Sequence, residues 1–458
     1  MKFTKMSLVA ALLIGSSAFA IDNVKVSGDA KLYYTTDDSV KGKSDSLFSV
    51  GNSAGQAALG LGITADLTKS VSAGAHLTAL STLGLEGQLV GNVWEGTNGL
   101  TESFWFDEAW IAATLGKTTA KIGRMELDTP LVFTENWSIA KNTFSAAVLV
   151  NQDIPDTTLV GAYVGQSSGV DADMRTPFVG IANRIGSTGS GYISTGVTTT
   201  GTPFSGPNGD STPFHQFYNG AFAAGLINNT VKPLTVQAWY YDATHAARAY
   251  WLQADVDMEG ILLGAQYTDM TLEKELLNNM GVAVNDDLSN DAYALMLGYT
   301  LKDVAKFKVA YSQTGKASYQ GNPAEIGSAF NLATAGATAQ SKLYTEAWWN
   351  YGYVTRADTT AINVTIEGNV SGIELGAYYT QANVDKNGNV TQSARGYQDM
   401  QEFTLTAGKD FGPLNATVAY IYTQADDQNT KDKNGINFNA DGKGKAFNTV
   451  QAYLTLNF

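Results

Sequence analysis

The sequence predicts an all-β protein, a transmembrane antiparallel β-barrel of about 18 strands. Three observations predict this fold. The chain begins with a stretch typical of an export signal, apolar and polar residues alternate in segments of roughly ten residues, and short turns alternate with long polar loops.

Residues 1–20 follow the plan of a secretory signal peptide. Lys2 and Lys5 precede a short apolar run, and Ala18-Phe19-Ala20 forms a small-residue cleavage pattern. The apolar run is too short for a membrane helix, which needs about 20 residues. We therefore predict that residues 1–20 are removed and that residues 21–458 form a single barrel domain.

The composition suits long strands that lie between lipid and water. Charged residues make up 16% of the chain, below the roughly 25% of a typical soluble domain. The chain has 47 glycines, 22 tyrosines and no cysteine, so disulfides and thiolate chemistry are excluded. A net charge of −14 opposes nucleic-acid binding and would favour cations if the acidic groups face a lumen.

Alternation with period two is the clearest pattern inside the chain. In segment 361–370, Ile362, Val364 and Ile366 share one face of the predicted strand, and Thr365 lies on the other. A soluble β-sandwich would also show alternation, so this pattern does not decide the class alone. The predicted lumen-facing groups include Lys121, Gln253, Asp255 and Glu367.

Turn spacing discriminates better between a sandwich and a barrel. Eight short turns alternate with longer polar stretches, as expected for short periplasmic turns and long extracellular loops. Each turn joins two strands, and a first and a last strand complete eighteen. The eight turns lie at 68–70, 115–117, 153–156, 228–230, 258–260, 302–303, 370–372 and 411–413.

The end of the sequence carries the sharpest single pattern. In the alternating segment 450–458, Leu454, Leu456 and Phe458 share one face. A phenylalanine that closes such a strand is typical of the insertion signal of outer-membrane barrels. We predict that these three residues form that signal and that the protein lies in a bacterial outer membrane, in contact with its lipid.

No motif predicts an enzyme. His76, His215 and His245 lie far apart, and catalytic or nucleotide-binding fingerprints are missing from the sequence. We therefore predict neither catalysis nor a cofactor, and we assign no metal.

Segment 124–142 is predicted to fold inward as the third long loop and to narrow the pore. It mixes apolar residues with charges. Phe133 and Trp137 are the predicted anchors of this loop, and its acids are expected to face the channel with an arginine opposite. The candidate groups of the constriction are Arg124, Glu126, Asp128 and Glu135.

The long stretch 315–357 carries an aromatic cluster. Two interpretations stay open: a platform that stacks sugars, or an anchor for a loop that folds into the barrel mouth, which we favour. The cluster consists of Tyr344, Trp348, Trp349, Tyr351 and Tyr353.

A resemblance to a known family rests on the run Asp107-Glu108-Ala109-Trp110 and on the segments 116–124, 127–130, 154–160, 237–241 and 451–454. These runs are similar to the Opr-family porins of the epsilonproteobacteria. This resemblance implies an eighteen-stranded homotrimer that passes small hydrophilic solutes and often prefers cations. It also implies that calcium could bind near the constriction, with acids of 126–135 as contributors.

We therefore predict an outer-membrane porin for passive diffusion of small hydrophilic solutes and ions. A substrate-specific channel is the alternative within transport, and a structural or adhesive surface barrel is the alternative from another class. A soluble secreted β-protein is a third, more remote one.

Overall fold

The structure is a computed structural model, and most of the predicted barrel domain is described in it. The predicted signal peptide and most of the longest loop, 169–213, lie outside the described residues. The described residues are 22–40, 46–84, 90, 92–93, 102–137, 139–168, 214–275, 285–316, 318–319, 322–325, 327–333, 340–384, 399–439 and 443–458.

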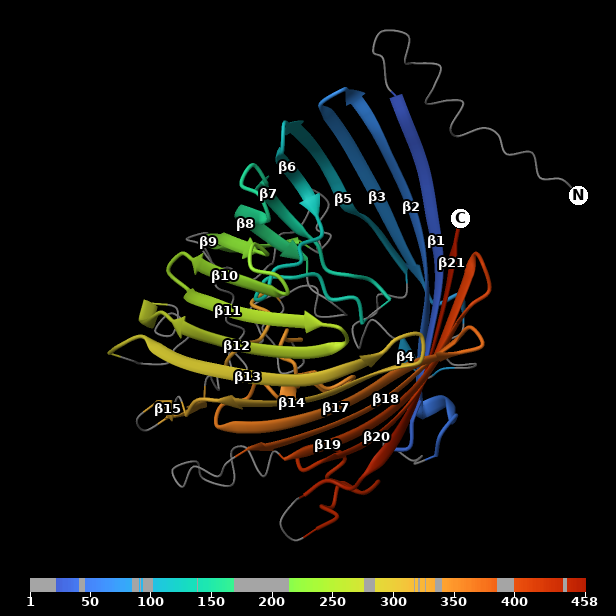
Figure 1. Ribbon diagram of the computed structural model, residues 1–458. Coiled ribbons are helices and arrows are strands. Elements are labelled where there is room, and N and C mark those ends of the chain that lie inside the picture. Colours follow the sequence, from blue (N-terminus) through green and yellow to red (C-terminus); the bar gives the residue numbers. More distant parts are fainter. Residues whose placement is uncertain are drawn as a thin grey trace, which may run out of the picture.

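One large sheet of nineteen strands accounts for nearly all of the described regular structure. Its shortest strand, β4, has two residues and pairs in parallel with β2. The other eighteen form a closed antiparallel barrel (Figure 1). The predicted fold class is therefore confirmed.

The strands and two short 3-10 helices have the following bounds. They are β1 Asp22–Asp37, η1 Val50–Asn52, β2 Ser53–Thr68, β3 Val71–Ser81, β4 Asn92–Val93, β5 Glu102–Leu115, β6 Thr118–Met125, β7 Phe144–Asn151, β8 Thr157–Ser168, β9 Phe214–Asn228, β10 Leu234–Ala243, β11 Ala247–Met258, β12 Ile261–Leu272, β13 Leu288–Leu301, β14 Ala305–Thr314, β15 Ser318–Tyr319, β16 Asn322–Glu325, η2 Tyr351–Tyr353, β17 Thr359–Val370, β18 Ile373–Val384, β19 Met400–Asp410, β20 Leu414–Ala425 and β21 Phe447–Asn457.

The barrel closes where β1 meets β21. Their register runs from Asp29 opposite Asn457 to Asp37 opposite Thr449. Beyond it, Gly28 N donates to the Phe458 carbonyl at 2.7 Å, and Phe458 N donates back at 2.9 Å. Because every strand has two neighbours, the backbone groups of the wall are satisfied within the sheet, as a lipid environment requires.

All eight predicted short turns join neighbouring strands at one end of the barrel. Ser371 and Gly372 form a typical example: their φ angles are 55° and 78°, the left-handed values of a two-residue hairpin turn. Since β1 begins and β21 ends on this side, it is the periplasmic end in the usual arrangement. The longer connections leave from the opposite end.

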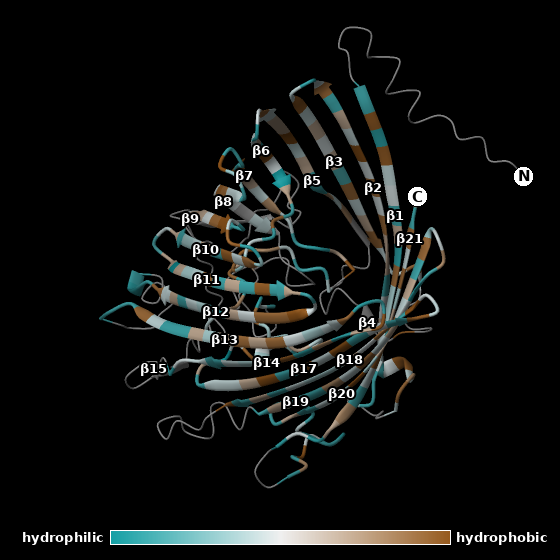
Figure 2. Ribbon diagram, in the orientation of Figure 1, coloured by the Kyte–Doolittle hydropathy of each residue, from teal (hydrophilic) through white to brown (hydrophobic). Residues whose placement is uncertain are grey.

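The outer face of the barrel is apolar. Leu263, Leu295, Val309 and Ile366 are all more than 40% exposed and alternate with inward residues. Figure 2 shows this change of hydropathy along the strands. Such a belt fits contact with lipid chains. In the described part of the chain, no helix has the length and apolar character needed to cross a membrane.

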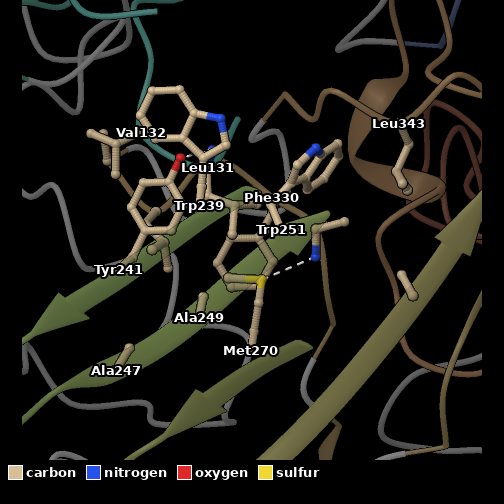
Figure 3. Packing of buried hydrophobic residues seen from close by; sticks show 14 of the residues in the cluster. Leu131, Val132, Trp239, Tyr241, Ala247, Ala249, Trp251, Met270, Phe330 and Leu343 are labelled. Carbon is tan, nitrogen blue, oxygen red and sulfur yellow. Dashed lines mark hydrogen bonds between the residues drawn. The ribbon is translucent and has the colours of Figure 1, made fainter. Parts of the chain in front are cut away.

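The inner face is less polar than the alternation suggested. On β10, β11 and β12, the inward side chains of Trp239, Tyr241, Trp251 and Met270 are buried. They form a hydrophobic cluster with residues of two long loops that lie inside the barrel (Figure 3). Much of the hydrophobic core of this protein therefore lies inside the barrel, and a smaller cluster packs Ile139 and Ala140 against Tyr33.

Candidate functional site

The third loop (126–143) follows β6 and folds into a small hairpin. Thr134 N donates to the Leu127 carbonyl at 2.7 Å, and Thr129 N donates to the Val132 carbonyl at 3.2 Å. Pro130 lies in the turn of this hairpin, where its fixed φ suits a turn. The hairpin presents an apolar tip.

This tip anchors the loop on the barrel wall. Leu131 is fully buried, and its N–H donates to Tyr241 Oη at 3.3 Å (Figure 3). Val132 is buried in the same cluster. Burial of an aliphatic side chain of this size contributes about 1.5–3 kcal/mol. The loop is therefore inward, as predicted, but the sequence reading missed these two anchors.

The predicted anchors Phe133 and Trp137 attach the third loop to another loop instead of the wall. Asn331 Nδ2 donates to the Phe133 carbonyl at 2.8 Å, and Asn331 Oδ1 accepts from Phe133 N at 3.3 Å. The Trp137 ring lies 5.9 Å from that of Trp349 and 6.1 Å from that of Tyr351. All three partners belong to the seventh loop (315–358).

The seventh loop packs on the third loop and on the wall. Leu332 N donates to the Leu131 carbonyl at 2.8 Å. Phe330 is buried beside Met270, whose sulfur accepts from Ala329 N at 3.0 Å (Figure 3). We call the described parts of both loops, 126–137, 139–143, 327–333 and 340–358, the loop body. The aromatic cluster therefore belongs to a loop that folds into the barrel, the interpretation we favoured.

Glu135 holds the two loops together. Its side chain is 1% exposed, so it does not face the channel as the sequence analysis predicted. Its carboxylate accepts from Asn331 Nδ2 at 2.9 Å, from Gln340 N at 3.1 Å and from Trp137 Nε1 at 2.8 Å. A buried carboxylate is stable when several donors satisfy it.

Glu402 attaches the other end of the seventh loop to the wall by hydrogen bonds. It is buried on the inner face of β19, and its carboxylate accepts from the backbone N–H groups of Trp348, Trp349 and Asn350 at distances from 2.6 to 3.3 Å. No local pattern in the sequence distinguishes Glu402 from other acids of the strands.

Two of the predicted acids are exposed, and each lies beside a lysine. The Asp128 side chain is 83% exposed and is paired with Lys342 of the seventh loop. The Glu126 side chain is 45% exposed and is paired with Lys141, which also binds Glu108 at 2.8 Å.

Arg124 does not lie opposite these acids. Residues 122 and 124 of β6 share one face, and Ile122 on that face is 58% exposed on the lipid side. Arg124 Nη1 donates to the carbonyl of Phe106, another residue exposed on the outside. Side chains alternate between the two faces of β6. The same alternation that predicts a lumen-facing Lys121 therefore places Arg124 on the outer face.

Of the four residues predicted to face the lumen, Asp255 contacts the loop body, and the other three contact neighbouring strands of the wall. Lys121 Nζ lies 4.1 Å from the centre of the Trp110 ring. Asp255 accepts a hydrogen bond from Tyr344 Oη of the loop body, and Gln253 accepts from Gln266 Nε2 at 3.2 Å. Glu367 accepts from Tyr378 Oη at 3.2 Å.

A gap of about 460 Å³ lies between part of the loop body and the wall strands β20 and β21. Thr417 and Tyr453 line it on the wall, where they are direct partners in the register. Trp137, Trp348 and Trp349 line it on the loop body. The loop body thus occupies much of the lumen and leaves this gap beside Thr417 and Tyr453.

A second group of polar residues lies at the loop end of β11 and β12. Ligand atoms of His245, Glu273 and Glu275 lie within 4.8 Å of one another, which the sequence analysis did not foresee. His245 Nδ1 is 2.7 Å from Glu275, and Arg248 holds Glu273 at 3.1 Å. Each acid therefore already has a basic partner.

Comparisons with known proteins give a fold but no sequence family. No protein-family model matches the sequence, and no curated protein matches it. The structure is similar to that of OccK8 (OprE) from Pseudomonas aeruginosa, with a TM-score of 0.63 and 14% identity over 96% of this chain and 99% of that one.

Two more solved structures are similar over almost their whole length. OccAB1 from Acinetobacter baumannii has a TM-score of 0.65 and 13% identity over 97% of this chain and 99% of that one. The outer membrane protein OpdK from Pseudomonas aeruginosa has a TM-score of 0.60 and 13% identity over 95% and 99%. At these identities the likeness shows a shared fold. The apolar belt of this chain fits the same fold in a membrane.

Proposed function

We propose that this protein is a porin, a passive channel that lets small hydrophilic solutes and ions cross the outer membrane. The observation that carries the proposal is the gap between the loop body and strands β20 and β21. A barrel of eighteen strands is wide enough for an aqueous lumen, and here two inward loops narrow it and leave this gap beside Thr417 and Tyr453. Transport through such a gap is diffusion, without a covalent step or a cofactor.

Cation preference is part of the proposal and rests on the net charge of −14. An acidic lumen raises the local concentration of cations. The acids of the third loop contribute less to cation preference than their number suggests, because Asp128 and Glu126 are each paired with a lysine. The resemblance to Opr-family porins adds a homotrimer, which native electrophoresis in detergent would test.

The experiment is conductance of the purified protein in a planar bilayer, with the reversal potential measured across a KCl gradient. We expect discrete current steps and a reversal potential of the sign given by cation selectivity. A protein that inserts but gives no steps would contradict the channel and favour a structural surface barrel. Steps with the opposite sign would remove the cation preference and leave the channel.

A further inference from the structure

The gap beside the loop body has the dimensions of a small-molecule site. Its volume, about 460 Å³, lies within the range of roughly 300–1,000 Å³ that such sites occupy. Three indoles line the loop side, and the Tyr453 ring lines the wall side. Passive diffusion through a wide opening does not require several aromatic rings in its lining.

The indoles are held in place by the loop body. Trp137 Nε1 donates to Glu135, and the Trp137 and Trp349 rings meet edge to face at 82°. Trp349 in turn contacts Tyr351 at 6.3 Å. The backbone N–H of Trp348 is fixed by Glu402 at 2.9 Å. Rings that are fixed before a ligand arrives lose little conformational entropy on binding.

Polar groups at the gap have hydrogen-bonding capacity left. The indole N–H of Trp348 and the side-chain amide of Gln340 are half-buried at the gap, and neither makes a hydrogen bond within the described ranges. Asn136 adds an exposed amide. Half-buried donors of this kind are the groups that usually orient a ligand.

The lining carries no charge without a partner among the residues described. Lys342 is paired with Asp128. Glu346 accepts a hydrogen bond from Ser341 N at 2.6 Å, and burial raises its pKa to about 8, so this carboxyl is neutral at pH 7. A site of this type has no strong preference for an ionic solute.

We propose that the gap is a binding site for a neutral sugar in its pyranose form. Such a ring offers an apolar C–H face to an indole, and its edge of hydroxyl groups matches the amides of Gln340 and Asn136 and the N–H of Trp348. This inference rests on the proposed channel function and adds the class of solute to it. It would make the protein a substrate-selective channel.

The test measures block of the ion current by a sugar in a planar bilayer. Maltose is the neutral probe, and benzoate and arginine are the charged ones. We expect maltose to reduce the current through the open channel in a saturable way. Trp348→Ala should raise the half-blocking concentration about tenfold, the effect of removing a central aromatic contact. Trp348→Phe keeps a ring without the N–H, so its half-blocking concentration should lie between those of the unmodified protein and Trp348→Ala.

The outcomes separate this inference from the channel itself. Phe104→Ala is the matched control, because Phe104 is 77% exposed on the outer face of β5, and it should leave maltose block unchanged. A conducting channel that maltose does not block would overturn the sugar site and leave the channel standing. Block that persists unchanged in Trp348→Ala, or block by benzoate or arginine alone, would overturn it as well.

Discussion

Asn331 donates a hydrogen bond through Nδ2 to Glu135 Oε1 over 2.9 Å, although the two residues are 196 positions apart in the sequence. Both side chains are buried. Through this contact the third and seventh loops form one body, so the width of the passage depends on both loops together.

Glu135→Ala should widen the channel. The substitution leaves the N–H donors of Asn331, Gln340 and Trp137 without their acceptor, and each unsatisfied buried donor costs about 1–3 kcal/mol. We expect a larger and noisier single-channel conductance in a planar bilayer. Glu259→Gln in an exposed short turn is the control. Equal conductance in both variants would mean that Glu135 does not hold the loop body together.

Leu131→Ala should weaken the attachment of the loop body to the barrel wall. Leu131 is fully buried against the cluster around Tyr241. Truncation of a buried leucine costs about 2–5 kcal/mol, so we expect faster hydrogen exchange in both loops. Ile122→Ala on the lipid side should not change it. Faster exchange limited to the third loop would show that the two loops are not coupled.

Glu126→Gln and Asp128→Asn together should reduce cation preference. These substitutions leave the positive charges of Lys141 and Lys342 less neutralised beside the passage. A unit charge at about 4 Å in water is worth about 1 kcal/mol, so removing two should lower the permeability ratio by at most about thirtyfold. The reversal potential in a KCl gradient measures this. An unchanged potential would place both groups away from the path of the ions.

Glu346 should make the loop body sensitive to pH. Burial, with smaller contributions from nearby Glu135 and Glu402, raises its pKa to about 8, against the opposing effects of the hydrogen bond from Ser341 N and of Lys342. A released loop would have the ordinary pKa of about 4.3. Between these values the docked loop holds a proton that the released loop loses, so docking weakens as pH rises. Current noise should therefore increase from pH 5 to about 8.

Glu346→Gln provides the control for this pH dependence. The amide keeps the shape of the protonated acid but cannot ionise. Its current noise should stay level across the same pH range. Noise that still increases with pH in this variant would assign the effect to another group.

The barrel was predictable because its signals are local. The eight turns and the alternation in segments such as 361–370 depend on neighbouring residues, and all eight turns were found. The loop body was predictable only in outline, because its partners are distant: Lys342 and Asp128 are 214 positions apart. No local pattern distinguishes a buried Glu135 from an exposed one. Arg124 was misplaced because the whole segment was treated as a loop, although residue 124 still belongs to β6.

The seam between β1 and β21 sets an order for assembly. It joins the strand that is synthesised first to the one synthesised last, and Gly28 meets Phe458 there. Until that contact forms, the sheet has two open edges, which invite pairing with other chains. The loop body is attached to β10, β12 and β19 from the inside, and its residues Ile139 and Ala140 share a buried cluster with Tyr33 of β1. It therefore links the middle of the sheet to the first strand and can act as an internal template for closure of the barrel.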